Sequence, residues 1–231
     1  MRQATPGVNN LRTVVGHSEE PGKPQEATLW PGWESGAPLR LGEALPQNFG
    51  NFALAVNNRG RVAGYYFEGD RPLPASKDKP WFRTPGNQVA GLPPEPAQTK
   101  TLTIEGRAYG INDSDVVVGE GRDTNGVLRG WVWRPGDGAF VFLSGADAGA
   151  YGISAAGAVV GRCGARACLW PASAGTALSY GEPIDLNGSI DRTDIQLGQA
   201  LQINTSGQIV TTGSVRSNPL EGSHIYLLTP K

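Results

Sequence analysis

The stretch Ala108-Tyr-Gly-Ile-Asn-Asp-Ser-Asp-Val-Val-Val-Gly119 decides the fold, because the chain repeats it in five variants. Each copy has a small residue, two variable positions, a Val or Ile, and a polar turn of Asn or Ser type. A second Val or Ile follows six positions after the first, usually with Gly two positions later. In the five copies the first Val or Ile is Val8, Val56, Ile111, Ile153 and Ile203. These positions are 48, 55, 42 and 50 residues apart. A period of about fifty residues is typical of repeat architectures.

Each copy starts a series of short strands. In the clearest copy, strands expected at 108–111 and 116–119 are followed by others at 130–133 and 139–143, with Pro135-Gly136 between the last two. No segment has helical periodicity, and turn residues recur about every ten positions, which favours an all-β fold. We therefore predict one domain over 1–231, a five-bladed β-propeller of four-stranded antiparallel blades. Its repeats are expected at about 4–48, 49–105, 106–146, 147–196 and 197–231.

Two structural questions stay open at this point. A solenoid of parallel coils is the alternative fold, although its rungs are usually shorter than these units. The fifth copy ends at Lys231 without a fourth strand. Because exposed edges invite pairing, we predict either a three-stranded last blade or a trimmed N-terminal strand that would have completed it.

The charge balance and the apolar pattern exclude some classes of partner. The chain carries 20 basic and 21 acidic residues, so nothing drives it toward nucleic acid or an anionic membrane surface. No apolar run approaches the roughly 18 residues that span a bilayer. Met1 leads straight into the first repeat without a secretory signal, so the chain is either cytoplasmic or begins after a removed leader. We expect a monomer without a cofactor or a bound metal.

The two cysteines, Cys163 and Cys168, flank an expected hairpin loop. Two thiols alone do not complete a structural zinc site, and the spacing is not that of a C-x-x-C redox motif. A cross-strand disulfide is geometrically allowed there, and it would indicate an oxidising compartment. A disulfide and a pair of buried free thiols both remain open.

The repeat also resembles that of a known family. The form A-x-x-I-N-x-x-G-x-V-V-G, followed by an aromatic strand such as Val132-Trp133 or Leu169-Trp170, is similar to the HAF repeat of probable extracellular bacterial proteins. The resemblance covers nearly the whole chain and is best in copies two to four. It implies a propeller-like repeat fold and an exported protein, periplasmic or extracellular, and it implies no activity. The naming His-Ala-Phe triplet is absent, and its positions hold Glu26-Ala-Thr28, Lys79-Pro-Trp81, Arg129-Gly-Trp131, Arg166-Ala-Cys168 and His224-Ile-Tyr226.

The polar turn of the repeat is interpreted as scaffold. Its Asn side chain can bond its own backbone two residues on, at Asn9, Asn57, Asn112 and Asn204, with Ser154 in the fourth copy. The alternate carboxylates of Asp113-Ser-Asp115 lack the Gly and the distal Glu of a calcium loop. Turn chemistry therefore explains these residues without a ligand.

Candidate site residues lie where the copies stop agreeing, at one mouth of the propeller. The residue after the second-strand Gly is His17, Tyr65, Glu120 or Arg162, with Thr212 in the fifth copy. The third strands begin with Glu26, Lys79, Arg129, Arg166 and His224. Antiparallel pairing is expected to bring each residue of the first set near one of the second. A solvated rim is polar in any case, but changing identities on a repeated scaffold favour function.

Arg107 joins these positions, and together they hold more cations than anions. This favours a binding module for a polar or anionic small ligand, a glycan or a protein, held by guanidinium groups. The alternative is a small propeller enzyme of the lyase, hydrolase or cyclase class, with Glu120 or His17 as acid or base. A scaffold without any small-molecule site is the third hypothesis. Among the tryptophans, Trp33 is expected to be exposed for stacking on a sugar ring, whereas the core is expected to hold Trp30, Trp81, Trp131, Trp133 and Trp170.

Overall fold

The computed structural model describes residues 7–32, 36–42, 45, 50–68, 77–84, 88–91, 102–123, 125–137, 140–145, 147–175, 178–217 and 222–230. Within them the strands form five separate antiparallel sheets, each made of strands that follow one another in the chain. The all-β prediction is confirmed. Trp33 lies outside the described residues.

The sheets have the following strands. The first contains β1 (Gly7–Val8), β2 (Thr13–Ser18), β3 (Glu26–Pro31) and β4 (Leu39–Arg40). The second contains β5 (Asn51–Val56), β6 (Val62–Glu68), β7 (Lys77–Thr84) and β8 (Gln88–Gly91). The third contains β9 (Leu102–Ile111), β10 (Val117–Asp123), β11 (Leu128–Trp133) and β12 (Val141–Phe142). The fourth contains β13 (Ala148–Ile153), β14 (Val159–Cys163), β15 (Arg166–Trp170) and β16 (Ile184–Asp185). The last contains β17 (Ile195–Ile203), β18 (Ile209–Val215) and β19 (His224–Leu228).

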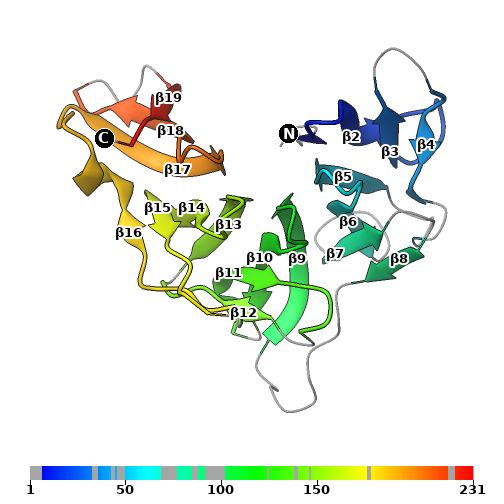
Figure 1. Ribbon diagram of the computed structural model, residues 1–231, viewed down its shortest axis with the longest axis horizontal. Helices are drawn as coiled ribbons and strands as arrows, with labels where there is room; N and C mark the ends of the chain where they lie inside the picture. The colour runs from blue at the N-terminus through cyan, green and yellow to red at the C-terminus, as the bar shows by residue number, and fades with distance from the viewer. Residues whose placement is uncertain are drawn as a thin grey trace.

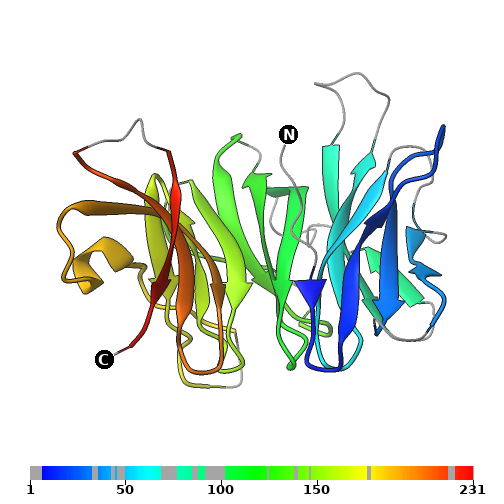
Figure 2. The ribbon, with the colours of Figure 1, turned by 90° about the horizontal axis from the view of Figure 1, so that it is seen from above.

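The sheets stand side by side around a common middle, as in a β-propeller (Figure 1). The first strand of each sheet faces the middle, and the short fourth strands lie at the periphery. The last sheet has three strands among the described residues, which is one of the two outcomes predicted for it. The arc is open, because the first and last sheets lie at opposite ends of it in Figures 1 and 2. The prediction of a propeller therefore needs this correction: the described sheets do not close a ring.

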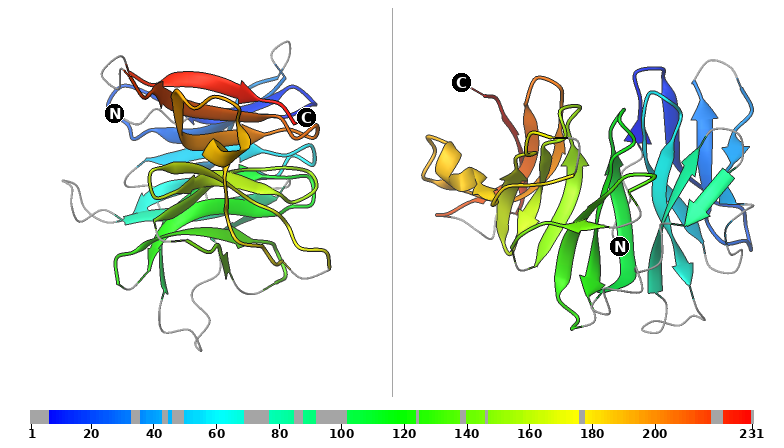
Figure 3. Two further views of the ribbon diagram at one scale, coloured as in Figure 1. Left: turned by 90° about the vertical axis from the view of Figure 1, so that its left-hand side faces the viewer. Right: turned by 60° about the horizontal axis from the view of Figure 1, so that its bottom comes forward.

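Two neighbouring repeat positions on the second strands hold the sheets together. The first, such as Val62, packs against the preceding sheet, where it joins Val15 and Ala27. The second, such as Ala63, packs against the following sheet, where it joins Val117. Strand side chains alternate between the two faces, so one Val-Val or Val-Ala pair serves both interfaces. The right-hand view of Figure 3 shows the resulting stack of sheets.

The repeated Gly of the second strand leaves space for a tryptophan side chain of the third strand. A Cβ on Gly119 would lie 2.1 Å from the Arg107 carbonyl oxygen and 2.3 Å from a ring atom of Trp131. A Cβ on Gly64 would likewise lie 2.9 Å from Trp81. Because these glycines have no side chain, the indole rings lie across the strand, and Trp81 and Trp131 are buried as predicted.

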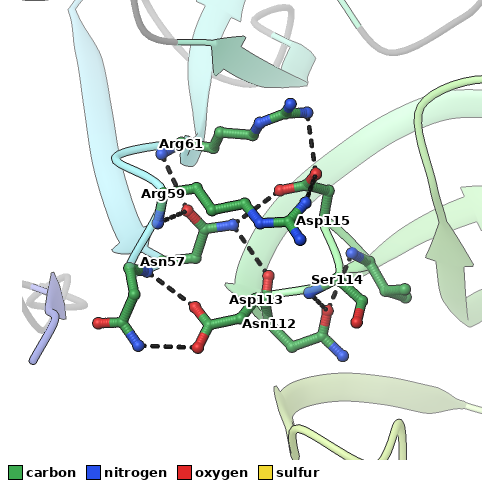
Figure 4. Close-up of polar contacts among 9 residues, drawn as sticks. Asn57, Arg59, Arg61, Asn112, Asp113, Ser114 and Asp115 are labelled. Atoms are coloured by element: carbon green, nitrogen blue, oxygen red, sulfur yellow. Dashed lines mark hydrogen bonds and ion pairs between the residues drawn. The ribbon is translucent and has the colours of Figure 1, made fainter.

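The asparagine turns connect one sheet to the next. The Nδ2 atom of Asn9 donates to the carbonyl oxygen of Asn57 at 2.8 Å, Asn57 donates to that of Asn112 at 3.0 Å, and Asn112 donates to that of Ser154 at 3.1 Å. Figure 4 shows the second step, where Asn57 also donates to Asp115 at 2.9 Å. We call this series the asparagine ladder. It ends at Ser154, whose hydroxyl accepts only from Ala158 of its own turn among the bonds of the described residues.

The two end sheets each leave one of these repeat positions without a facing sheet. Val14 and Val210 are only half-buried, whereas the inner valines at the same positions are fully buried. Other apolar side chains are exposed at the ends too: Val8 is 59% exposed in β1 and Ile225 is 76% exposed in β19. The core therefore consists of four layers between sheets and a smaller cluster of Phe52, Leu54 and Tyr65, rather than one central cluster.

Three smaller features complete the fold. Cys163 and Cys168 form a disulfide across the β14–β15 hairpin, which decides the question that the sequence left open. A 3₁₀ turn, η2 (Leu186–Ser189), places Leu186 in the layer between the last two sheets. In the described part of the chain, no helix has the length and hydropathy of a membrane-crossing helix.

Candidate functional site

A groove of about 1030 Å³ lies on the inner side of the arc. Its walls are the first strands of four sheets, from Leu54 of β5 to Leu201 of β17, together with residues of the second strands. Because alternate residues of a strand point to the same side, β9 gives it side chains two positions apart, Arg107 and Tyr109, whereas β5 and β13 give it one each, Leu54 and Tyr151. The groove is therefore built from the repeat itself, at positions that differ from copy to copy.

Four apolar or aromatic side chains of the groove wall were not predicted as site residues. They occupy the first variable position of the repeat, directly after the small residue, and they are Leu54, Tyr109, Tyr151 and Leu201. Each follows a buried Ala directly and is the unpaired residue of a β-bulge in its first strand. The signal was present in the sequence, because this position holds Leu, Tyr, Tyr and Leu within an otherwise constant frame.

Some of the residues that directly follow the second-strand Gly line the groove, and others do not. Tyr65, Arg162 and Thr212 line it. Glu120 occupies the same position of the third sheet but is 7% exposed and lies behind the lining residues. His17 is placed at the end of the arc, with its ring edge-on to Phe52 at a centroid distance of 5.1 Å.

Glu120 holds the polar ends of two lining tyrosines. Tyr109 donates its hydroxyl to Oε1 of Glu120 at 2.8 Å, and Tyr151 donates to Oε2 at 3.2 Å. Arg162 donates from Nε to the Tyr151 hydroxyl at 2.8 Å and places a terminal nitrogen 3.9 Å from Oε2. The four side chains form one connected unit across the third and fourth sheets. In this geometry Glu120 positions the groove wall and does not face the groove.

The electrostatics of this unit keep both tyrosines protonated. Burial, and then the negative charge of Glu120, raise the pKa of Tyr151 to about 12. The same two causes, in the same order, raise the pKa of Tyr109 well above its ordinary value. Both phenols are therefore hydrogen-bond donors to Glu120 throughout the physiological range.

A missing side chain makes room for this unit. The first strand of the fourth sheet has Gly149 where the third sheet has Arg107, as the strand register indicates. A Cβ on Gly149 would lie 2.7 Å from Oε2 of Glu120 and 2.9 Å from the Tyr151 hydroxyl. The carboxylate can therefore approach Tyr151 only because position 149 has no side chain.

A second polar unit lies at the other end of the groove. The guanidinium group of Arg107 lies 4.4 Å from the centre of the Tyr65 ring. Phe52 stacks on Tyr65 as well, with ring centroids 4.9 Å apart and an interplanar angle of 15°. Asp78 accepts from Nε of Arg107 at 2.5 Å. The Arg107 side chain is thus fixed in direction by a ring and a carboxylate.

The third-strand set does not pair as the sequence analysis expected. Tyr65 pairs with Pro80 rather than Lys79, and Glu120 pairs with Gly130 rather than Arg129. The same shift of one residue separates His17 from Glu26, Arg162 from Arg166 and Thr212 from His224. A shift of one position moves a side chain to the other face of the sheet.

The third-strand residues instead make contacts away from the groove. Arg166 pairs with Asp185 at 3.1 Å, and Glu26 pairs with Arg40 at 3.1 Å. Arg129 lies 3.4 Å from Asp123, and the His224 ring lies 6.3 Å from that of Tyr226. Lys79 stands opposite Tyr66 on the preceding strand, β6. None of these side chains is among the described residues that line the groove.

The carboxylates of the 113–115 turn have structural partners. Asp113 accepts from the backbone and side-chain nitrogens of Asn58 at 2.8 and 2.7 Å. Asp115 is buried and accepts from Asn57, Arg59 and Arg61 of the preceding sheet (Figure 4). Among the described residues, no group of three or more His, Cys, Asp or Glu side chains could hold a metal ion.

Comparisons with known proteins give similarity in structure only. No protein-family model matches the sequence, and no curated protein is significantly similar to it. The acylaminoacyl peptidase of Pyrococcus horikoshii is similar at a TM-score of 0.58 and 14% identity, over 99% of this chain and 38% of the peptidase. The chain thus spans less than two fifths of that protein. The BP39L lectin of Burkholderia pseudomallei (TM-score 0.48, 12% identity, 94% of this chain and 63% of the lectin) is also similar. So is a mutant of AofleA from Arthrobotrys oligospora (TM-score 0.46, 13% identity, 96% of this chain and 67% of that protein). At these identities the likeness shows the fold alone.

Proposed function

We propose that the chain is a binding module that takes a small saccharide, or a similar polar ligand, in the groove on the inner side of the arc. In this proposal the five sheets act as five blades of an incomplete propeller-like arc. The observation that carries it is the composition of the groove wall, where Tyr109 and Tyr151 lie beside Arg107 and Arg162. Ligand sites are concave and largely apolar, with a few fixed polar groups, and this wall has that character.

The buried unit behind the wall supports binding over catalysis. Both oxygens of Glu120 accept hydrogen bonds from tyrosine hydroxyls, so the carboxylate fixes side chains that would contact the ligand. An acid or base must come within hydrogen-bond reach of the substrate, and Glu120 lies behind the lining residues. His17 is likewise not among the described lining residues. We therefore place the enzyme hypothesis second.

An exported location belongs to the same proposal. Disulfides persist in oxidising compartments and are rare in the cytosol of most organisms. The Cys163–Cys168 disulfide supports such a compartment, in agreement with the expectation drawn from the HAF-type repeat.

Ligand binding can be tested with a saccharide panel and two matched variants. Saturation-transfer NMR would identify the saccharides that bind, and calorimetry would measure their affinity. Thr212→Trp fills the groove, whereas Thr205→Trp places the same ring on an exposed turn outside the groove lining. We expect Thr212→Trp to weaken binding by about tenfold or more through steric exclusion, and Thr205→Trp to leave it unchanged. The proposal fails if no saccharide binds, or if a bound saccharide is insensitive to Thr212→Trp.

A further inference from the structure

The two arginines of the groove differ in how many of their donors the protein uses. Arg162 donates from Nε to Tyr151 and from Nη1 to the carbonyl oxygens of Asp147 and Gly164, at 2.8, 3.1 and 3.2 Å. Its other terminal nitrogen faces Glu120. Arg162 is therefore largely occupied with holding the wall together.

Arg107 uses one of its donors in hydrogen bonds to the described residues. Nε donates to Asp78, and the guanidinium carbon lies 4.4 Å from the centre of the Tyr65 ring. Within the described part of the chain, the two terminal nitrogens have no hydrogen-bond acceptor, and the side chain lines the groove at 23% exposure. A guanidinium group fixed at Nε leaves the edge between its terminal nitrogens for a two-pronged contact with a carboxylate.

The Tyr65 hydroxyl provides a second donor at the same place. Tyr65 is only 5% exposed, with its ring between Phe52 and Arg107, yet it lines the groove. No acceptor for its hydroxyl is present among the described residues. Burial raises the pKa of this phenol, so the hydroxyl keeps its proton. A buried tyrosine usually has a partner for its hydroxyl, and here the open groove is where one would come from.

We propose that Arg107 and Tyr65 form a subsite for a carboxylate carried by the ligand, so that the preferred saccharides are acidic ones. This inference rests on the proposed function and narrows it to one ligand class. Asp78 offsets part of the positive charge, so recognition depends on the direction of the donors more than on net charge. A neutral saccharide would leave the Arg107 edge facing water, whereas a uronate would fill it with two charge-assisted hydrogen bonds.

The test compares a trisaccharide of galacturonate with its fully methyl-esterified form, which has the same rings without the charge. We expect calorimetry to give an affinity for the acid about tenfold to a hundredfold higher than for the ester, the range typical of hydrogen bonds to charged groups. Arg107→Gln should reduce the affinity for the acid to that for the ester. The matched control Arg129→Gln, on the same sheet but outside the groove lining, should leave the preference intact.

A second variant keeps the test sound if Arg107→Gln does not fold. Tyr65→Phe retains the ring stack with Phe52 and removes only the hydroxyl, and we expect a smaller, severalfold loss for the acid alone.

The possible results separate the two proposals. If acid and ester bind equally and both are lost in Thr212→Trp, the groove binds saccharides but the carboxylate subsite is refuted. An acid preference that survives Arg107→Gln also refutes it. If neither trisaccharide binds at millimolar concentration, the acidic-ligand inference fails, and the proposed function then depends on the wider panel.

Discussion

Asn57 of one sheet donates its side-chain amide to the backbone carbonyl oxygen of Asn112 in the next sheet, at 3.0 Å. The side-chain oxygen of the same Asn57 accepts from two backbone nitrogens of its own turn, those of Arg59 and Arg61, each at 3.0 Å. One side chain thus closes its own turn and bonds the neighbouring sheet. This double use explains why the repeat has Asn at this position, whereas turn chemistry alone would accept Asp or Ser.

The ladder makes a quantitative prediction for Asn57→Ala. The substitution removes the turn bonds and the bonds to the next sheet, so we expect the free energy of unfolding to fall by about 2–3 kcal/mol. Asn204→Ala is the matched control, because Asn204 makes the same turn bonds at 3.0 and 2.9 Å but donates to Gln208 of its own turn. We expect Asn204→Ala to lower the free energy of unfolding by about 1 kcal/mol less than Asn57→Ala does. This difference is the contribution of one to two hydrogen bonds. Urea unfolding measures both, and equal losses would show that the bond between sheets contributes nothing.

Ser154 is the position where the ladder can be extended. Its hydroxyl reaches only its own turn, so no side-chain bond of this series joins the fourth sheet to the fifth within the described residues. Ser154→Asn should restore a donor toward the carbonyl oxygen of Asn204 and raise the free energy of unfolding by about 1 kcal/mol. Thermal and urea unfolding are the measurements. A destabilised Ser154→Asn variant would mean that the last two sheets are not aligned as the others are.

Because the end sheets each have an uncovered face, we expect the same Val→Ala substitution to lower the free energy of unfolding by different amounts at different positions. Val160 packs fully buried between the last two sheets, whereas Val210, at the same repeat position, has no facing sheet among the described residues. We expect Val160→Ala to cost about 2 kcal/mol through a buried cavity, and Val210→Ala to cost less than about 1 kcal/mol. Urea unfolding of both variants at several protein concentrations provides the comparison. If Val210→Ala costs as much as Val160→Ala, the Val210 face is covered in solution.

The sequence predicted the sheets well because their positions are fixed by local rules. Strand alternation, the turn asparagines and the repeated Gly each act within a few residues, and five copies make the frame visible. The open arc was not predictable in this way, since closure depends on how much each sheet is rotated against the next, and no short pattern of letters contains that angle.

The candidate site was predicted less well, and the reason is the register. Tyr65 and Arg162 were identified because their positions change identity within a constant frame, and Arg107 because it directly precedes the expected first strand of the third copy. For the third-strand residues, such as Lys79 and Arg129, the predicted register was wrong by one residue. In a strand, an error of one residue places the side chain on the opposite face of the sheet. Tyr109 and Tyr151 were missed because a tyrosine between two small residues is equally typical of a core strand.

Gly149 should tolerate no side chain if the Glu120 unit is as described. Gly149→Ala would place its Cβ 2.7 Å from the carboxylate and 2.9 Å from the Tyr151 hydroxyl, forcing them apart. We expect a loss of about 1–3 kcal/mol in the free energy of unfolding and a changed near-ultraviolet circular dichroism from the displaced tyrosines. Gly188→Ala is the control, because a Cβ there meets no atom within 4 Å. An unperturbed tyrosine spectrum in Gly149→Ala would contradict the contact between Glu120 and Tyr151.

The same unit predicts a loss of stability at alkaline pH. Burial and the charge of Glu120 raise the pKa of Tyr151 from 10.0 to about 12, so the folded protein holds this proton more tightly than the unfolded chain does. Its contribution to stability is therefore complete below pH 10.0 and is lost as the pH rises through about 12. Urea unfolding as a function of pH should show this loss in the parent protein and a shallower decline in Tyr151→Phe. Tyr226→Phe, which changes a tyrosine outside the unit, should decline as the parent does. Since Tyr180, whose pKa burial also raises to about 12, is retained in both variants, only the difference between them reports on Tyr151. Identical alkaline slopes in all three proteins would contradict the placement of Tyr151 against Glu120.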